Sequence, residues 1–185
     1  MLGTTPFESA AREAPGARSA PLYTPEQRKR RDESPWTMVQ GVLAPAQFVV
    51  FVVSVVLVLR ALTTGQGLAL ASASVVVKTL FLYAIMVTGA IWEKRVFGRY
   101  LFAPAFYWED VFSMLVIGLH TAYLGALVFG YMSARGQLVL ALFAFGTYVI
   151  NATQFILKLR AARVDEQRAR LVASVGDAES LGEAR

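Results

Sequence analysis

Two short clusters of charged and aromatic residues hold most of the groups in this sequence that could do chemistry. One cluster ends a long apolar segment and the other opens the next; their members are Trp92, Glu93, Lys94, Arg95, Trp108, Glu109 and Asp110. Carboxyl groups donate and accept protons, which makes Glu93, Glu109 and Asp110 candidate general acids and bases. A negative charge is stabilised at a helix start, which also explains Asp110. Glu93 lies at a helix end, so we expect it to pair with a neighbouring Lys or Arg, or to be protonated.

A second group of polar residues lies inside the apolar segments. Lys78 and His120 each stand about ten residues from an end of their segment, near its middle. Gln47, Asn151 and Gln154 also fall within apolar stretches. Polar side chains in lipid are costly, so each is a candidate for a functional role. The alternative is that these groups only hydrogen-bond one helix to another.

The elements that must position these residues are four apolar segments, at about 39–62, 68–92, 111–131 and 138–159. The chain has 185 residues, of which 56% are hydrophobic, and its mean hydropathy is +0.49. A helix of roughly 20 residues spans the ~30 Å hydrocarbon core of a bilayer. Only helices and closed barrels satisfy their backbone groups in lipid, and these segments lack the alternation of barrel strands. We therefore predict an all-α, integral membrane four-helix bundle.

The positive charges predict the orientation of this bundle. Fifteen of the 18 basic residues fall in the two ends of the chain or between residues 93 and 107. Because basic residues gather on the cytoplasmic side, both termini are predicted to be cytoplasmic. This topology accounts for the net charge of +5, so we do not expect nucleic-acid binding. Residues 1–21 and 164–185 are predicted to be mobile tails around one domain, 22–163, with a helical extension as the alternative for the second tail.

Composition excludes several kinds of site. The sequence has no cysteine, which excludes disulfides, thiolate nucleophiles and thiolate-bound metals. One histidine and scattered carboxylates give no metal-ligand spacing such as Glu-x-x-His, so no metal site is predicted.

Four stretches resemble a known family. They are SPWTMVQGVLAPAQF (34–48), MVTGAIWEKRVFGRYLFAPAFYWEDVFSML (86–115), LHTAYL (119–124) and NATQFILKLRAAR (151–163). Together they are similar to the 3-vinyl bacteriochlorophyllide hydratases of phototrophic bacteria, over about residues 22–163. The resemblance implies addition of water to the 3-vinyl group of chlorophyllide a or a related bacteriochlorin. The product, a 3-(1-hydroxyethyl) pigment, lies on the way to bacteriochlorophyll a.

The resemblance also implies a setting for the reaction. We expect a multi-pass protein of the bacterial inner membrane whose partners are the pigment, the lipid bilayer and other enzymes of bacteriochlorophyll synthesis. No cofactor of its own is expected, because the magnesium belongs to the pigment. The resemblance assigns no catalytic residues, so the site predictions rest on the residues themselves.

Hydration of a vinyl group needs a proton donor, a positioned water and a base. Glu109 shares a helical face with Ser113 and His120, so it is the expected donor. Glu93 is expected to position the water or take its proton. Asp110 is turned ~100° away from Glu109 on a helix and is expected to act mainly as a helix-start charge.

The remaining candidates concern binding of the pigment. Lys94, Arg95 or Arg99 could meet its propionate, and His120 could ligate its magnesium. Further candidates for contact with the pigment are Trp92, Trp108, Gln47, Lys78, Asn151 and Gln154.

Two other classes of function stay open on the residues alone. A pigment carrier or an assembly factor for photosynthetic complexes would need the pocket but no proton donor. A small transporter would use Lys78 and His120 as a proton relay.

Overall fold

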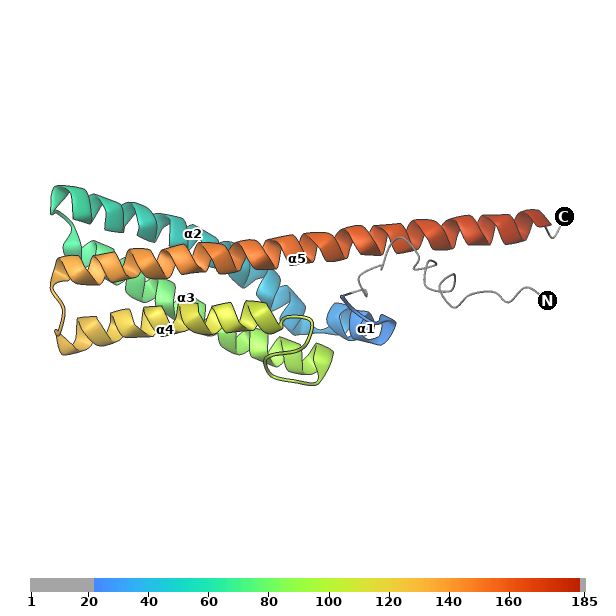
Figure 1. Ribbon diagram of the computed structural model, residues 1–185, viewed down its shortest axis with the longest axis horizontal. Helices are drawn as coiled ribbons and strands as arrows, with labels where there is room; N and C mark the ends of the chain where they lie inside the picture. Colours follow the sequence, from blue (N-terminus) through green and yellow to red (C-terminus); the bar gives the residue numbers. More distant parts are fainter. Residues whose placement is uncertain (1–21, 184–185) are drawn as a thin grey trace, which may run out of the picture.

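The computed structural model describes residues 22–183, and its regular secondary structure over that range is helical. Five helices follow one another: α1 (Pro25–Glu33), α2 (Pro35–Thr64), α3 (Leu68–Phe97), α4 (Tyr107–Phe129) and α5 (Ala134–Glu183) (Figure 1). Four of them, α2 to α5, are long and apolar enough to cross a membrane. The predicted all-helical class with four candidate spans is confirmed, and α1 is a helix that the hydropathy pattern did not predict.

Helix boundaries differ from the predicted ones mainly at the charged clusters. α3 continues to Phe97 and α4 begins at Tyr107, so both clusters are helical rather than part of a loop. α5 continues without interruption to Glu183, through the segment that was predicted as a C-terminal tail. The N-terminal tail, 1–21, lies outside the described residues. Gly98 ends α3 in the left-handed conformation, φ 82°, which a residue without a Cβ adopts at little cost.

The long helices form two antiparallel hairpins. α2 packs along α3 and α4 packs along α5, while fewer contacts join one hairpin to the other. The two hairpin turns, 65–67 and 130–133, lie together at one end of the molecule, which we call the turn end (Figure 1). α1 and the 98–106 segment lie at the other end of the four-helix bundle, which we call the loop end, and α5 continues past them. The line along which the hairpins meet is the hairpin seam.

Apolar side chains cover the outside of the bundle as well as part of its interior. Large exposed residues such as Phe48, Val56 and Phe143 face outward, as expected where lipid is the solvent. Inside, a buried cluster that includes Val58, Tyr123 and Phe145 joins all four long helices. Apolar side chains therefore occur both inside and outside the bundle, whereas buried polar side chains mark its interior.

The N-terminal part of the described chain docks onto the loop end. Tyr23, just before α1, is buried and stacks on Phe97 with ring centroids 5.8 Å apart. Burial raises the pKa of Tyr23 to about 12, so its phenol stays neutral. Arg31 of α1 lies 4.9 Å from the Tyr23 ring and 3.9 Å from a carboxylate oxygen of Glu166 on α5. α1 thus connects α3 to the part of α5 beyond the apolar stretch.

Candidate functional site

Glu93 and Asp110 form a buried pair of carboxyl groups at the loop end. Glu93 comes from the last turns of α3 and Asp110 from the first turn of α4, and they are 5% and 3% exposed. Their side chains meet at hydrogen-bonding distance. The backbone N–H of Phe102 donates to Asp110 Oδ2 at 2.7 Å, and that of Ala103 donates to Glu93 Oε2 at 3.3 Å. The 98–106 segment therefore folds back over the pair and holds both groups in place.

The conformation of this segment fits its role. Phe102 has φ 57°, and it is the only residue other than glycine with a positive φ between residues 22 and 183. Left-handed backbone at a bulky residue is unfavourable and persists only where the surrounding structure enforces it. Here it turns the Phe102 and Ala103 amides toward the two carboxyl groups. The strain therefore lies where the chain binds Asp110.

Asp110 lies in the first turn of α4, as predicted, but its side chain is buried rather than turned away from the bundle. The ~100° between successive residues does separate Glu109 from Asp110, but α4 packs against two helices. Glu109 faces α5, and Asp110 faces the end of α3. Glu93 meets Asp110 instead of a neighbouring cation, because Lys94 Nζ donates to the Gly98 carbonyl at 3.0 Å.

Contact between two carboxyl groups has a direct chemical consequence. Two negative charges at this distance repel strongly in a site that excludes water, so the pair cannot be fully ionised. One proton held between them converts the repulsion into a hydrogen bond. The pair then has one acid and one base in the same place.

Glu109 is in a different electrostatic situation. Lys158 Nζ donates to Glu109 Oε2 at 2.7 Å, in an ion pair that joins α4 to α5. Glu109 shares the buried face of α4 with Ser113 and His120, as predicted. Glu109 therefore has a cation as its partner, whereas Glu93 and Asp110 have each other and two backbone N–H groups. Lys158 also lies 5.1 Å from the centre of the Phe106 ring.

Aromatic rings surround this carboxyl site. Phe106 is buried and stacks on Phe155 of α5 with centroids 5.8 Å apart, and Trp92 meets Phe106 edge to face at 5.8 Å. The Trp92 indole N–H donates to Thr37 at 2.9 Å, which ties α3 to α2. Trp108 points outward and is 67% exposed. The site therefore has a flat, apolar surround next to its acid and base.

The three cations expected to meet a propionate lie on the outside of the loop end. Lys94, Arg95 and Arg99 are all exposed. Lys94 is 5.3 Å from the Tyr100 ring. The structure does not bring these cations together with the buried carboxyl pair.

A deeper layer of polar side chains crosses the hairpin seam, with one member from each long helix: Gln47, Lys78, His120 and Tyr148. We call these four residues the deep layer. Lys78 Nζ lies 3.7 Å from the centre of the Tyr148 ring, and Gln47 is next to the Tyr148 hydroxyl. His120 is close enough to Lys78 to interact electrostatically with it. Sequence analysis had singled out three of the four.

Polar atoms of the deep layer lack partners among the described residues. They are Gln47 Oε1, Lys78 Nζ and His120 Nε2. The other nitrogen of His120, Nδ1, lies 2.8 Å from the Val116 carbonyl. Since a carbonyl only accepts, Nδ1 carries the hydrogen and Nε2 of a neutral ring has a free lone pair. That lone pair fits the expected role as a magnesium ligand, although the ring is fully buried.

Asn151 and Gln154 link the two layers. Asn151 Nδ2 donates to Ser113 at 2.8 Å, between α5 and α4. The Asn151 and Gln154 side-chain oxygens are buried without a partner in the described part of the chain. Polar groups therefore continue along the interior from the Glu109–Lys158 pair toward the deep layer.

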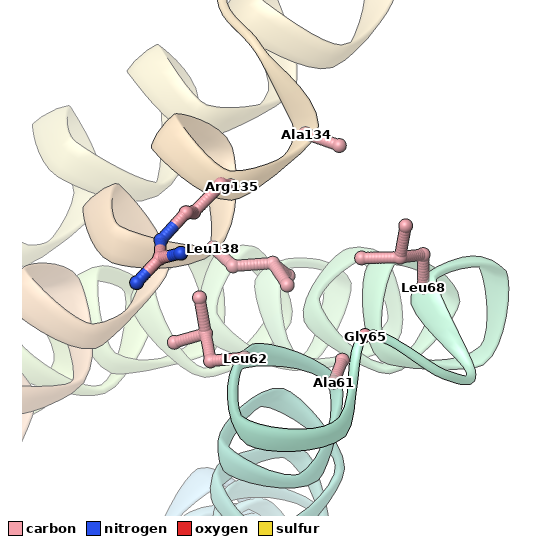
Figure 2. A pocket seen from close by; sticks show the side chains of 7 residues that line it. All are labelled: Ala61, Leu62, Gly65, Leu68, Ala134, Arg135 and Leu138. Carbon is pink, nitrogen blue, oxygen red and sulfur yellow. The ribbon is translucent and has the colours of Figure 1, made fainter.

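A small cavity lies at the turn end, far from the carboxyl pair. Its volume is about 170 Å³, and it is lined by Ala61, Leu62, Gly65, Leu68, Ala134, Arg135 and Leu138. Figure 2 shows these side chains around the gap between the end of α2 and the start of α5. None of the predicted site residues lines it.

Sequence analysis missed three functional contacts. Lys158 was counted only among the basic residues that predict the orientation. Tyr148 gave no signal, because an aromatic residue in an apolar segment is ordinary. The Phe102 and Ala103 amides could not be found, since backbone donors depend on the path of the loop rather than on residue type.

Fold and site together define a multi-pass helical membrane protein with two buried carboxyl groups in contact at one end of its bundle. The family model described as 2-vinyl bacteriochlorophyllide hydratase matches residues 23–161. This chain belongs to that family. Position 2 in this name and position 3 in systematic tetrapyrrole numbering denote the same vinyl-bearing carbon.

Two curated relatives carry the same name. The 2-vinyl bacteriochlorophyllide hydratase of Cereibacter sphaeroides is 61% identical over 156 residues, which cover 84% of this chain and 97% of the relative. That of Rhodobacter capsulatus is 63% identical over 143 residues, 77% of this chain and 83% of the relative. No solved structure matches.

Proposed function

We propose that this protein adds water to the vinyl group of a bacteriochlorophyllide-type pigment, giving a 1-hydroxyethyl group. Its family and the names of its relatives support this activity. The observation that carries the mechanism is the contact between Glu93 and Asp110. A hydratase needs an acid and a base at the same point, and a carboxyl pair with one proton offers both.

The reaction runs in two proton transfers. The protonated carboxyl group of the pair donates its proton to the terminal CH₂ carbon, which becomes a methyl group. The adjacent carbon is left as a cation that the macrocycle delocalises. A water oxygen bonds to this carbon and loses one proton to the carboxyl pair. The pair ends with the one proton it began with, and the net change is addition of one water.

The neighbouring groups keep the pair in this state. The Phe102 and Ala103 amides orient the accepting oxygens, so the two carboxyl groups keep their geometry in both protonation states. Glu109 forms an ion pair with Lys158 next to them and joins α4 to α5. We assign Glu109 and Lys158 to positioning and to electrostatics, and proton transfer to Glu93 and Asp110.

The macrocycle is proposed to enter through the hairpin seam, beside Trp92, Phe106 and Phe155. The seam suits a flat guest, because fewer contacts join the hairpins than hold each one together. No cofactor beyond the substrate is required, since the pigment brings its own magnesium.

The loop end is proposed to face the cytoplasm of a bacterium, with the four spans in the inner membrane and both termini on the cytoplasmic side. Exposed Lys94, Arg95 and Arg99 at this end agree with the preference of basic residues for the cytoplasmic side.

The deciding experiment is incubation of membranes that contain this protein with the vinyl pigment, followed by chromatography and mass measurement. A product heavier by one water, absent with membranes lacking the protein, is the expected result. Unchanged pigment that co-purifies with the protein would instead support a carrier.

A further inference from the structure

We propose that Lys78 is the counter-ion for the propionate carboxylate of the pigment, so that the deep layer selects the free acid over its esters. The inference rests on the proposed function, because a bacteriochlorophyllide differs from an esterified bacteriochlorophyll in this carboxyl group. The pigment would then lie along the hairpin seam. Its vinyl group would reach Glu93 and Asp110, and its propionate would reach Lys78.

Lys78 is buried away from any hydrogen-bond partner in the described part of the chain. Its side chain is 0% exposed, and Nζ has no hydrogen-bond partner among residues 22–183. The Tyr148 ring at 3.7 Å compensates a cation only in part. An ionisable group buried inside a membrane protein without a partner is costly and marks a functional site.

The membrane-spanning part of this chain also has no anion of its own at this depth. No Asp or Glu occurs between Glu33 and Glu93, or between Asp110 and Asp165. The remaining deep-layer groups are neutral acceptors or donors: an amide, an imidazole whose Nε2 only accepts, and a phenol. A carboxylate that binds Lys78 would therefore come from a ligand and not from these spans.

The distance between the carboxyl pair and the deep layer also supports this placement. His120, at the depth of Lys78, is ten residues from Asp110 on α4, which corresponds to about 15 Å along a helix. The vinyl group and the propionate stand on different pyrrole rings, so they are separated by much of the macrocycle plus the propionate arm. A pigment with its vinyl group at the carboxyl pair can therefore place its carboxylate in the deep layer. Its magnesium would lie between the two layers, so His120 would be a neighbour of the propionate rather than the magnesium ligand that the sequence suggested.

The exposed cations are weaker candidates for this role. Lys94, Arg95 and Arg99 are solvated, and exposed ion pairs contribute little. A carboxylate bound to buried Lys78 instead makes charge-assisted hydrogen bonds out of reach of water. This assignment replaces the expectation that a loop-end cation binds the propionate.

The test compares the free acid of the pigment with its methyl ester, which keeps the vinyl group and removes the charge. For the unaltered protein we expect KM for the ester to exceed that for the acid by roughly 10- to 100-fold, the value of a hydrogen bond to a charged group. In Lys78→Met, KM for the acid should rise to that of the ester, so that the preference for the acid is lost. Arg99→Gln is the matched control and should keep the preference for the acid.

The outcomes separate this inference from the proposed function. If the unaltered protein hydrates neither pigment, the proposed function fails. If it hydrates both with equal KM, hydration stands and the role of Lys78 is refuted, without any need for a variant. If Lys78→Met keeps the preference while Arg99→Gln loses it, the pigment lies with its propionate at the loop end, and the inference is overturned.

Discussion

Replacing the carboxyl pair one member at a time is the sharpest test of the mechanism. Glu93→Gln and Asp110→Asn keep the size and the accepting oxygen of each side chain, so the N–H groups of Ala103 and Phe102 keep their acceptors. The new amide NH₂ can donate to the remaining carboxylate. The structure therefore predicts that both variants fold, and that only the shared, transferable proton is lost.

The expected loss of activity follows from that proton. A general acid or base contributes typically 10²- to 10⁴-fold to a rate, which corresponds to about 3–5 kcal/mol of the activation barrier. Because the two groups act as one unit, each single variant should lose most of this contribution. The double variant should then be about as slow as either single one, rather than slower by the product of both factors.

The assay follows conversion of the vinyl pigment to the hydroxyethyl product in detergent-solubilised protein, with pigment absorbance as a measure of binding. In D₂O the product should carry one deuterium on its new methyl group, delivered by the pair. Glu33→Gln is the control, because Glu33 is an exposed carboxylate of α1. Near-normal turnover in both single variants, or fully multiplicative losses in the double variant, would refute the shared proton.

Three further predictions follow from the geometry. Lys158→Met should lower stability by roughly 2–3 kcal/mol, because it leaves the buried Glu109 carboxylate without its charged donor; thermal unfolding in detergent measures this, and an unchanged midpoint would argue against the ion pair. Phe102→Pro should abolish activity, since proline has no N–H to donate and cannot adopt φ 57°, whereas Phe102→Gly should keep the backbone and most of the turnover; equal activity of the two would contradict the bound loop. Reporter fusions after residue 163 and within 98–106 should report cytoplasm, and fusions within the 65–67 and 130–133 turns the opposite side; a cytoplasmic signal from either turn would contradict the proposed orientation.

Hydropathy was sufficient to predict the four long helices, because lipid imposes a minimum length of apolar chain on each span. The predicted ends were least accurate where Trp, Glu and Lys gather. Such residues interrupt an apolar pattern without interrupting a helix, so α3 and α4 extend into both clusters. Periodicity also placed Glu109, Ser113 and His120 on one buried face correctly, since that relation depends on α4 alone.

Relations between helices could not be predicted in the same way. The Glu93–Asp110 contact depends on how the 98–106 segment returns from α3 to α4, and the Glu109–Lys158 ion pair depends on the register of α4 against α5. Neither the path of this segment nor the register of the two helices can be predicted from the residue types of a short stretch of sequence. The sequence therefore indicated which carboxyl groups were candidates, but the packing decided which two contact each other and which one binds a cation.

The two polar layers differ in the hydrogen-bond and charge partners that the protein itself provides, and this difference bears on their functions. At the loop end the chain provides amides, a cation and a second carboxyl group, so the acid–base pair is already organised before any substrate arrives. In the deep layer it provides Lys78, which costs roughly 3 kcal/mol at the centre of a membrane helix, and no anion to offset it. A structural role would favour an apolar residue there, since helix packing gains little from an unpaired ammonium group. A binding role requires such a group, because a carboxylate that enters the seam then gains a charged partner that lipid does not offer. We therefore propose that the fixed pair performs the chemistry while the unpaired lysine selects and orients the pigment along the seam.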